Sequence, residues 1–130
     1  MFGLFDFLGR LIVAIARDYR TVTATIANGA SLSGEVDLGG AAILGIHMPA
    51  AWTAAVLTFQ AAPASGGTFA DVYDDLGNEV TLTVDTSRAV GVDLKSGALA
   101  PYRFIKIRSG TSAAAVAQGA ERALTLSLKG

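Results

Sequence analysis

From Thr21 to the C-terminus, apolar residues recur at every second position in short runs, and Gly, Asn, Asp or Ser interrupt these runs at short intervals. An alternation with a period of two gives an extended strand one apolar face and one polar face. The clearest runs are Val80-Leu82-Val84 and Leu124-Leu126-Leu128. Parallel strands need long, usually helical crossovers, and no second helical pattern occurs in this part of the chain. We therefore expect an all-β body with antiparallel strands.

The turn residues divide this body into about nine short strands at roughly ten-residue spacing, which favours an antiparallel sandwich or barrel. We expect a jelly-roll-like β-sandwich over residues 21–130. The continuously apolar stretch Ile43–Met48 is typical of a strand covered on both faces, and Thr111–Gly119, rich in Ala and Ser, is expected to be a long loop. The expected strands are 21–26, 33–38, 43–48, 54–60, 68–73, 79–85, 90–94, 102–108 and 124–129.

The first twenty residues follow a different period. Their large apolar residues lie three and four positions apart, and Asp6, Arg10 and Arg17 fall on the opposite side, which predicts an amphipathic α-helix over residues 1–20. Asp6 and Arg10 interrupt the apolar run, so we expect no membrane-spanning helix. The first charge is an acid, which argues against a cleaved secretory signal. The anchors that we expect to bind a partner are Phe2, Leu4, Phe5, Phe7, Leu8, Leu11 and Ile12.

Composition excludes several classes of function. The 130 residues are enough for one domain with a core, and 52% of them are hydrophobic while only 16% are charged. There is no cysteine and one histidine, which removes disulfides, thiol catalysis, cysteine-based zinc sites and most catalytic triads. The net charge of −1 gives no general electrostatic reason for nucleic-acid binding. No phosphate-binding or nucleophile motif occurs, so we expect neither an enzyme nor a cofactor.

Two polar features have a functional and a structural interpretation. The acidic cluster from Asp71 to Glu79 contains oxygen ligands near Gly77 that would suit calcium, but its spacing does not match an EF-hand loop. Asp, Gly and Asn are also favoured in hairpin turns, and we prefer a hairpin at Asp74–Asn78 and no metal site. His47 has no second histidine nearby, so we expect it to be a packed or hydrogen-bonded structural residue.

Three aromatic residues are candidates for stacking on a sugar ring, namely Trp52, Tyr73 and Tyr102. A lone Trp flanked by Ala and Thr is more often a core or interface anchor, and we favour that role for Trp52. The charges are also uneven along the chain, because residues 71–93 are mostly acidic and residues 95–129 mostly basic. We weigh an electrically two-faced molecule against a mixed solvated surface, and slightly favour the mixed surface.

Short sequence motifs between residues 36 and 128 resemble those of small structural proteins encoded in the head-gene region of tailed bacteriophages and of gene transfer agents. Their order is also similar to discoidin-like, galactose-binding-like jelly rolls. Such domains commonly carry disulfides and exposed loop aromatics, whereas this chain has no Cys and only Trp52 as a loop aromatic. The motifs are MPAAWTAA at 48–55, LTFQ at 57–60, GGTF at 66–69, VYD at 72–74, YRFIKIRSGT at 102–111 and QGAER at 118–122.

The resemblance implies a virion structural protein on the capsid surface, assembled in the host cytoplasm. It would decorate the capsid or form the base of a head fibre or spike, and its partners would be other virion proteins in a homo-oligomeric or symmetric assembly. The N-terminal helix would supply the docking face. In a second interpretation this helix packs across its own sandwich and the protein is a compact monomer. A glycan-binding module using Trp52, Tyr73 or Tyr102 is the rival function, and a peripheral membrane protein is disfavoured because the polar face of the helix carries both Asp6 and Asp18.

Overall fold

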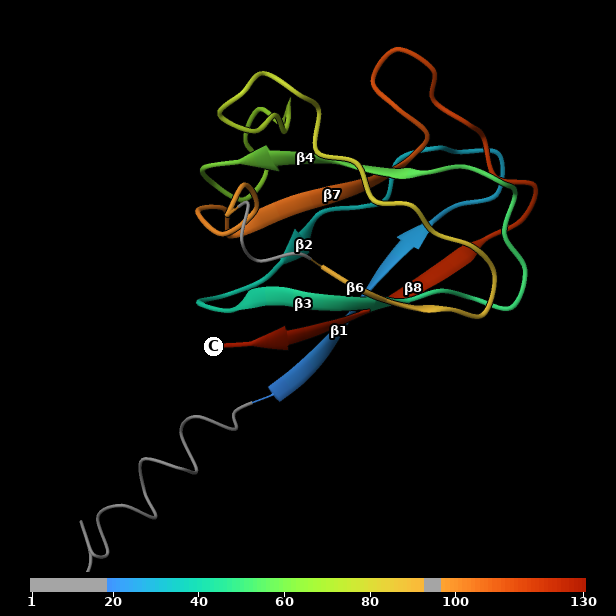
Figure 1. Ribbon diagram of the computed structural model, residues 1–130, viewed down its shortest axis with the longest axis horizontal. Helices are drawn as coiled ribbons and strands as arrows, with labels where there is room; N and C mark the ends of the chain where they lie inside the picture. Colours follow the sequence, from blue (N-terminus) through green and yellow to red (C-terminus); the bar gives the residue numbers. More distant parts are fainter. Residues whose placement is uncertain (1–18, 93–96) are drawn as a thin grey trace, which may run out of the picture.

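The computed structural model describes residues 19–92 and 97–130, which form two four-stranded antiparallel sheets facing each other (Figure 1). This confirms the expected all-β class. One sheet has the order β1-β8-β3-β6 and the other has the order β2-β7-β4-β5. The strands are β1 (Tyr19–Ile26), β2 (Val36–Asp37), β3 (Ala42–His47), β4 (Leu57–Ala62), β5 (Ala70–Asp71), β6 (Ala89–Gly91), β7 (Phe104–Ser109) and β8 (Arg122–Lys129).

The strand pairs are nested along the sequence. β1 pairs with β8, β2 with β7, β3 with β6, and β4 with β5, each in antiparallel register. Two further pairs, β3 with β8 and β4 with β7, join these units into the two sheets. The first and last strands therefore lie side by side, and β5, β6 and β7 return along the strands that precede them.

The core lies between the sheets and follows the alternation expected from the sequence. In β8, Leu124, Leu126 and Leu128 are fully buried, while the intervening residues are exposed or partly buried. In β1, Ala24 and Ile26 are buried, and the threonines between the apolar positions are exposed. Burial of a Leu or Ile side chain stabilises a fold by about 1.5–3 kcal/mol, so these inward rows account for much of the driving force.

Segment 79–85 was expected to be a strand but forms only isolated bridges. Leu82 exchanges two backbone hydrogen bonds with Leu57, each of 2.9 Å, while Val80 donates its amide to the carbonyl of Val72 at 3.0 Å. The segment thus pairs with two different parts of the chain, and neither pairing extends into a ladder. This is one reason why the described residues contain eight strands instead of about nine.

The N-terminal prediction is only partly within the described residues. Tyr19 and Arg20, which we assigned to the end of the helix, are the first residues of β1. The rest of the predicted helix, residues 1–18, lies outside the described residues. Within residues 19–92 and 97–130 we find no helix with the length and apolarity needed to cross a membrane.

The prediction that Ile43–Met48 is covered on both faces is wrong. Ile43, Ile46 and Met48 are buried, but His47 at the end of β3 is exposed, so the interpretation of His47 as a packed residue is wrong too. β3 lies in the middle of its sheet between β8 and β6, and its other residues are only partly buried.

Gly110 directly follows β7 and has a conformation that other residues rarely adopt, with φ at +91°. A Cβ atom built there would lie 2.5 Å from the Ala114 carbonyl oxygen and 2.7 Å from the Val116 amide nitrogen, both backbone atoms. The Gly110 carbonyl accepts a 2.7 Å hydrogen bond from the buried Thr58 hydroxyl. This glycine therefore lets the expected loop at Thr111–Gly119 turn back tightly against the sheet.

Candidate functional site

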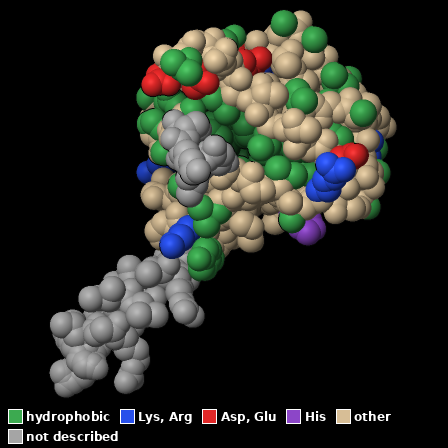
Figure 2. All heavy atoms as spheres, viewed as in Figure 1, with side chains coloured by type: hydrophobic (Ala, Val, Ile, Leu, Met, Phe, Trp, Pro, Cys, Tyr) green, Lys and Arg blue, Asp and Glu red, His purple; other side chains and the backbone are tan. Residues whose placement is uncertain are grey.

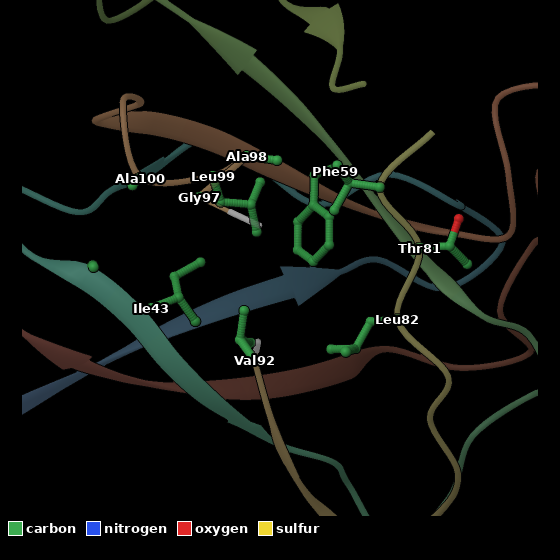
Figure 3. A pocket seen from close by; sticks show the side chains of 11 residues that line it. Ile43, Phe59, Thr81, Leu82, Val92, Gly97, Ala98, Leu99 and Ala100 are labelled. Atoms are coloured by element: carbon green, nitrogen blue, oxygen red, sulfur yellow. The ribbon is translucent and has the colours of Figure 1, made fainter. Parts of the chain in front are cut away.

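A concave feature lined by described residues is an apolar cavity of about 300 Å³ between the two sheets. Ile43 of β3 and Val92 contribute from one layer, and Phe59 of β4 and Leu82 contribute from the other. Figure 3 shows these side chains pointing toward a common space, with Leu99 beside them. On the face of the molecule seen in Figure 2, apolar side chains gather around a hollow.

The lining of the cavity limits its chemistry. Thr81 supplies the one polar side chain among the described lining residues, and no titratable group is among them. A cavity of this size is at the lower end of the range for small-molecule sites, which usually combine apolar walls with a few placed polar groups. The described walls of the cavity are therefore suited to binding apolar groups and contain no titratable side chain.

A buried ion-pair cluster occupies the opposite, outward face of the sheet that contains β4 and β7. The guanidinium of Arg108, whose side chain is 8% exposed, pairs with the carboxylates of Asp71 and Glu79, the latter at 3.2 Å. It also donates to the Thr58 hydroxyl at 3.3 Å. Gln60 donates to Asp71 at 3.2 Å. We call Arg108, Asp71, Glu79, Thr58 and Gln60 the Arg108 cluster.

The Arg108 cluster holds together elements that lie far apart in the sequence. Its carboxylates come from β5 and the hairpin that follows it, and Glu79 also accepts the Ser112 amide at 3.0 Å. The hydrogen bond from Arg108, followed by that from Gln60, lowers the pKa of Asp71 below its ordinary value. The cluster thus fixes the 73–79 hairpin and the loop after β7 onto the sheet, which is a structural role.

A second buried polar residue, Gln118, links three loops. Its side chain accepts the Thr53 amide at 2.8 Å, donates to the Thr53 carbonyl at 3.0 Å and donates to the Ser109 hydroxyl at 2.6 Å. Its backbone exchanges hydrogen bonds with Gly29 and Ala30. In the sequence, Gln118 is notable only as part of the QGAER motif. No local pattern predicts its contacts with Thr53 and Ser109.

The aromatic candidates are not brought together. Trp52 is buried in the core, 9% exposed, and its indole nitrogen donates to the Ala55 carbonyl at 3.1 Å. This placement agrees with the core interpretation and leaves no free ring face for a sugar. Tyr73 and Tyr102 are 50% and 38% exposed. The hydroxyl of Tyr73 lies 3.5 Å from that of Ser112, beyond the end of β7.

Tyr102, by contrast, precedes the start of β7. A six-residue strand spans about 17 Å, so the two exposed tyrosines lie near opposite ends of β7. Tyr102 lines a smaller hollow of about 170 Å³ together with Arg103 and the Gly39-Gly40 turn. Tyr102 is thus a single exposed aromatic beside an arginine, apart from Tyr73.

The acidic cluster forms the expected hairpin. The Asp74 carboxylate accepts the backbone amides of Leu76 and Asn78, both at 2.9 Å, and Gly77 has φ at +84°. One oxygen of Asp74 therefore accepts both turn amides, as in an Asx turn. Among residues 19–92 and 97–130, no group of three or more His, Asp or Glu side chains is gathered as a metal ion would require.

The acidic and basic stretches meet in the fold. Arg108 of the basic stretch pairs with Asp71 and Glu79 of the acidic one, so these charges offset each other within one sheet. Arg103 forms a two-pronged hydrogen bond with Asp37, at 2.8 and 3.1 Å. That bond, followed by the Gly39 amide, lowers the pKa of Asp37 to about 2. These contacts favour the mixed-surface interpretation over two separate charged faces.

The seven predicted partner-binding anchors, Phe2 to Ile12, lie outside the described residues. Sequence reasoning missed the cavity because its walls come from residues 42–43, 59, 80–82, 92 and 97–100, which show no common local pattern. The sequence places the two acids of the Arg108 cluster in an acidic stretch and Arg108 in a basic one, and it does not predict their contact.

No protein-family model matches this chain, and searches of the curated proteins and of the solved structures also find no match.

Proposed function

We propose that this protein is a structural component of a virion that attaches to the capsid, as a decoration protein or as the base of a head fibre or spike. Its N-terminal segment, residues 1–18, would supply the attachment anchors Phe2, Leu4, Phe5, Phe7, Leu8, Leu11 and Ile12. Its partners would be other virion proteins, arranged symmetrically on the capsid surface after assembly in the host cytoplasm.

The observation that carries the proposal is where this apolar segment joins the body. It continues directly into β1, a strand at the edge of its sheet, and the first residue of β1, Tyr19, is 61% exposed. The segment that carries the anchors therefore joins the body at an exposed edge strand. A row of large apolar side chains placed in a groove of a partner is a common mode of protein recognition.

We also infer that the body is a jelly roll. The nested pairs β1·β8, β2·β7, β3·β6 and β4·β5 are what results when one long antiparallel hairpin is rolled into two sheets. Jelly rolls occur in viral capsid proteins and in lectins, so this fold is compatible with both the virion hypothesis and the glycan-binding hypothesis. The choice depends on the side chains.

Those side chains favour a structural role over catalysis or sugar binding. The buried polar residues Arg108, Gln118 and Thr58 are engaged in contacts that join strands and loops. Trp52 is buried, and Tyr73 and Tyr102 are separated by the length of β7. No observation in the described residues specifically favours the glycan hypothesis.

The test is incorporation of the full chain into particles. Cells that produce the particles would express the tagged wild-type protein, the variant Leu4→Ser with Leu8→Ser, or the matched control Arg10→Ser with Arg17→Ser, whose changes fall on the predicted polar side. Particles are purified on a density gradient and probed for the tag. We expect the wild type and the control in the particle fraction, and the leucine variant in the soluble fraction with an unchanged β-sheet circular dichroism spectrum.

Two results would overturn the proposal. One is a wild-type protein that never sediments with particles, and the other is a leucine variant that is incorporated as well as the wild type. A titration with a panel of mono- and oligosaccharides tests the rival function, and saturable binding at millimolar sugar would favour the glycan-binding module.

A further inference from the structure

We propose that the inter-sheet cavity is the docking site for the chain's own N-terminal segment, with Phe5 and Leu8 seated in it when the protein is free in solution. This inference concerns the isolated molecule and does not depend on whether the outside partner is a virion protein. It goes beyond attachment because it assigns the same apolar residues a second place to bind, within their own chain.

Size is the first argument. A cavity of about 150 Å³ lined by aliphatic and aromatic side chains accepts one benzene molecule. The cavity between the sheets is about 300 Å³, twice that volume, and therefore has room for a phenyl ring and a leucine side chain together. An unfilled apolar space costs stability in proportion to its volume, so an apolar occupant from the same chain is favoured.

Chemistry is the second argument. The walls of the cavity are apolar, with Ile43, Phe59, Leu82, Val92 and Leu99 among them, and Thr81 is the one polar side chain among the described lining residues. An occupant with a charged or strongly polar end would leave that end without a partner. Phe5 and Leu8 are wholly apolar and lie on the predicted apolar side of the segment, one turn of a helix apart.

Reach is the third argument. Lys129 of β8 is paired with Tyr19 on one side and with Ala42 on the other, and Ala42 lines the cavity. Neighbouring strands lie about 4.8 Å apart, so the segment leaves β1 about 10 Å from the edge of the cavity. The residues from Leu8 to Asp18 would span about 16 Å as a helix and more if extended. Either conformation brings Phe5 and Leu8 to the cavity.

Connection through a short linker favours this occupant over a second molecule. Two groups joined by a short flexible linker meet at an effective concentration in the millimolar range, which exceeds the concentration of free copies in a dilute sample. The same residues cannot occupy the cavity and an external groove together. Binding to a partner must therefore release them, so the cavity would shield the anchors until assembly.

A spin-label experiment on the full chain tests the proposal. The chain has no cysteine, so Arg10→Cys, on the predicted polar side, gives a single attachment point for a nitroxide. Methyl groups of Val92 and Leu99 in the cavity are observed by NMR, and Ile26, about 23 Å along β1 from Tyr19, is the reference methyl. We expect the nitroxide to broaden the cavity methyls strongly and Ile26 little.

Two matched variants and one mixing experiment complete the test. In the labelled protein, Phe5→Ser should restore the cavity methyl signals, whereas Asp6→Ser, on the predicted polar side, should leave them broadened. The broadening should not change when the labelled protein is diluted. Sharp cavity methyls in the wild type, equal effects of the two variants, or broadening that appears only when isotope-labelled and spin-labelled molecules are mixed would each overturn the proposal, the last in favour of a second copy.

Discussion

Replacing Arg108 by Met tests whether the ion-pair cluster stabilises the body as its geometry implies. The Arg108 side chain is 8% exposed, and its two partners differ in exposure, at 14% for Glu79 and 32% for Asp71. Met retains much of the length of the arginine stem but none of its charge. The variant therefore leaves two carboxylates facing an apolar side chain.

The expected cost follows from these exposures. Removing one partner of a buried ion pair typically destabilises a protein by 3–5 kcal/mol, because the remaining charge stays buried without compensation. Asp71 is exposed enough to regain water, so most of the cost comes from Glu79 and the total should fall near the lower limit, at about 3 kcal/mol. For a domain of this size the melting temperature should fall by roughly 12 °C.

The pH dependence provides the decisive measurement. The lowered pKa of Asp71 means that its contribution to the free energy of unfolding is fully present above the ordinary carboxyl pKa and is lost as the pH falls through the lower folded pKa. The difference between wild type and Arg108→Met should therefore be largest near pH 7 and should shrink below about pH 4 by the part that Asp71 contributes. Adding Glu79→Gln to the variant should recover part of the loss.

Chemical denaturation of the full chain at several pH values measures these differences. A loss below about 1 kcal/mol at pH 7 would show that the cluster acts as an exposed ion pair. An equal loss at pH 7 and pH 3 would show that the cost comes from packing and not from uncompensated charge. Either result would refute the electrostatic argument.

Three further outcomes follow from other parts of the fold. Leu126→Ala, in the fully buried row of β8, should lower the free energy of unfolding by about 2–5 kcal/mol in urea denaturation, and a loss below 1 kcal/mol would contradict its central place in the core. Gly110→Ala should destabilise clearly more than Gly29→Ala, because both glycines have positive φ but only at Gly110 would the methyl group meet backbone atoms; equal melting temperatures would disprove this. NMR titration should find the pKa of Asp37 at about 2, and Arg103→Gln should raise it toward the usual value, whereas an unchanged pKa would mean that the ion pair does not form in solution.

Much of the local structure could be predicted from the sequence. The inward rows of β1 and β8 follow directly from alternating residues, and the turn after Asn28 and the hairpin at Asp74–Asn78 follow from residues that favour such turns. The errors occurred where tertiary pairing overrides a local pattern. Segment 79–85 alternates cleanly, yet its backbone partners, Val72 and Leu57, belong to different parts of the chain, so no strand forms there.

The candidate site could not be predicted in the same way. The cavity walls come from five separate parts of the chain. Tyr73 and Tyr102 are equally plausible sugar-stacking candidates in the sequence, but they lie near opposite ends of β7 in the fold. The Arg108 cluster joins residues 29 and 37 positions apart, so its acids and its base looked like two separate charged stretches. Only their contact shows that these charges hold the fold together.

The sequence by itself determined that the described residues are all-β, which residues of β1 and β8 face the core, and that an apolar segment precedes the body. These properties depend on the period of two of an extended backbone and on turn preferences, and both act over a few residues. The tertiary structure alone decided that β1 lies beside β8, that an apolar cavity opens between the sheets, and that Arg108 meets two acids. Each of these depends on contacts between distant residues, which form only when the whole chain folds and which no local pattern encodes.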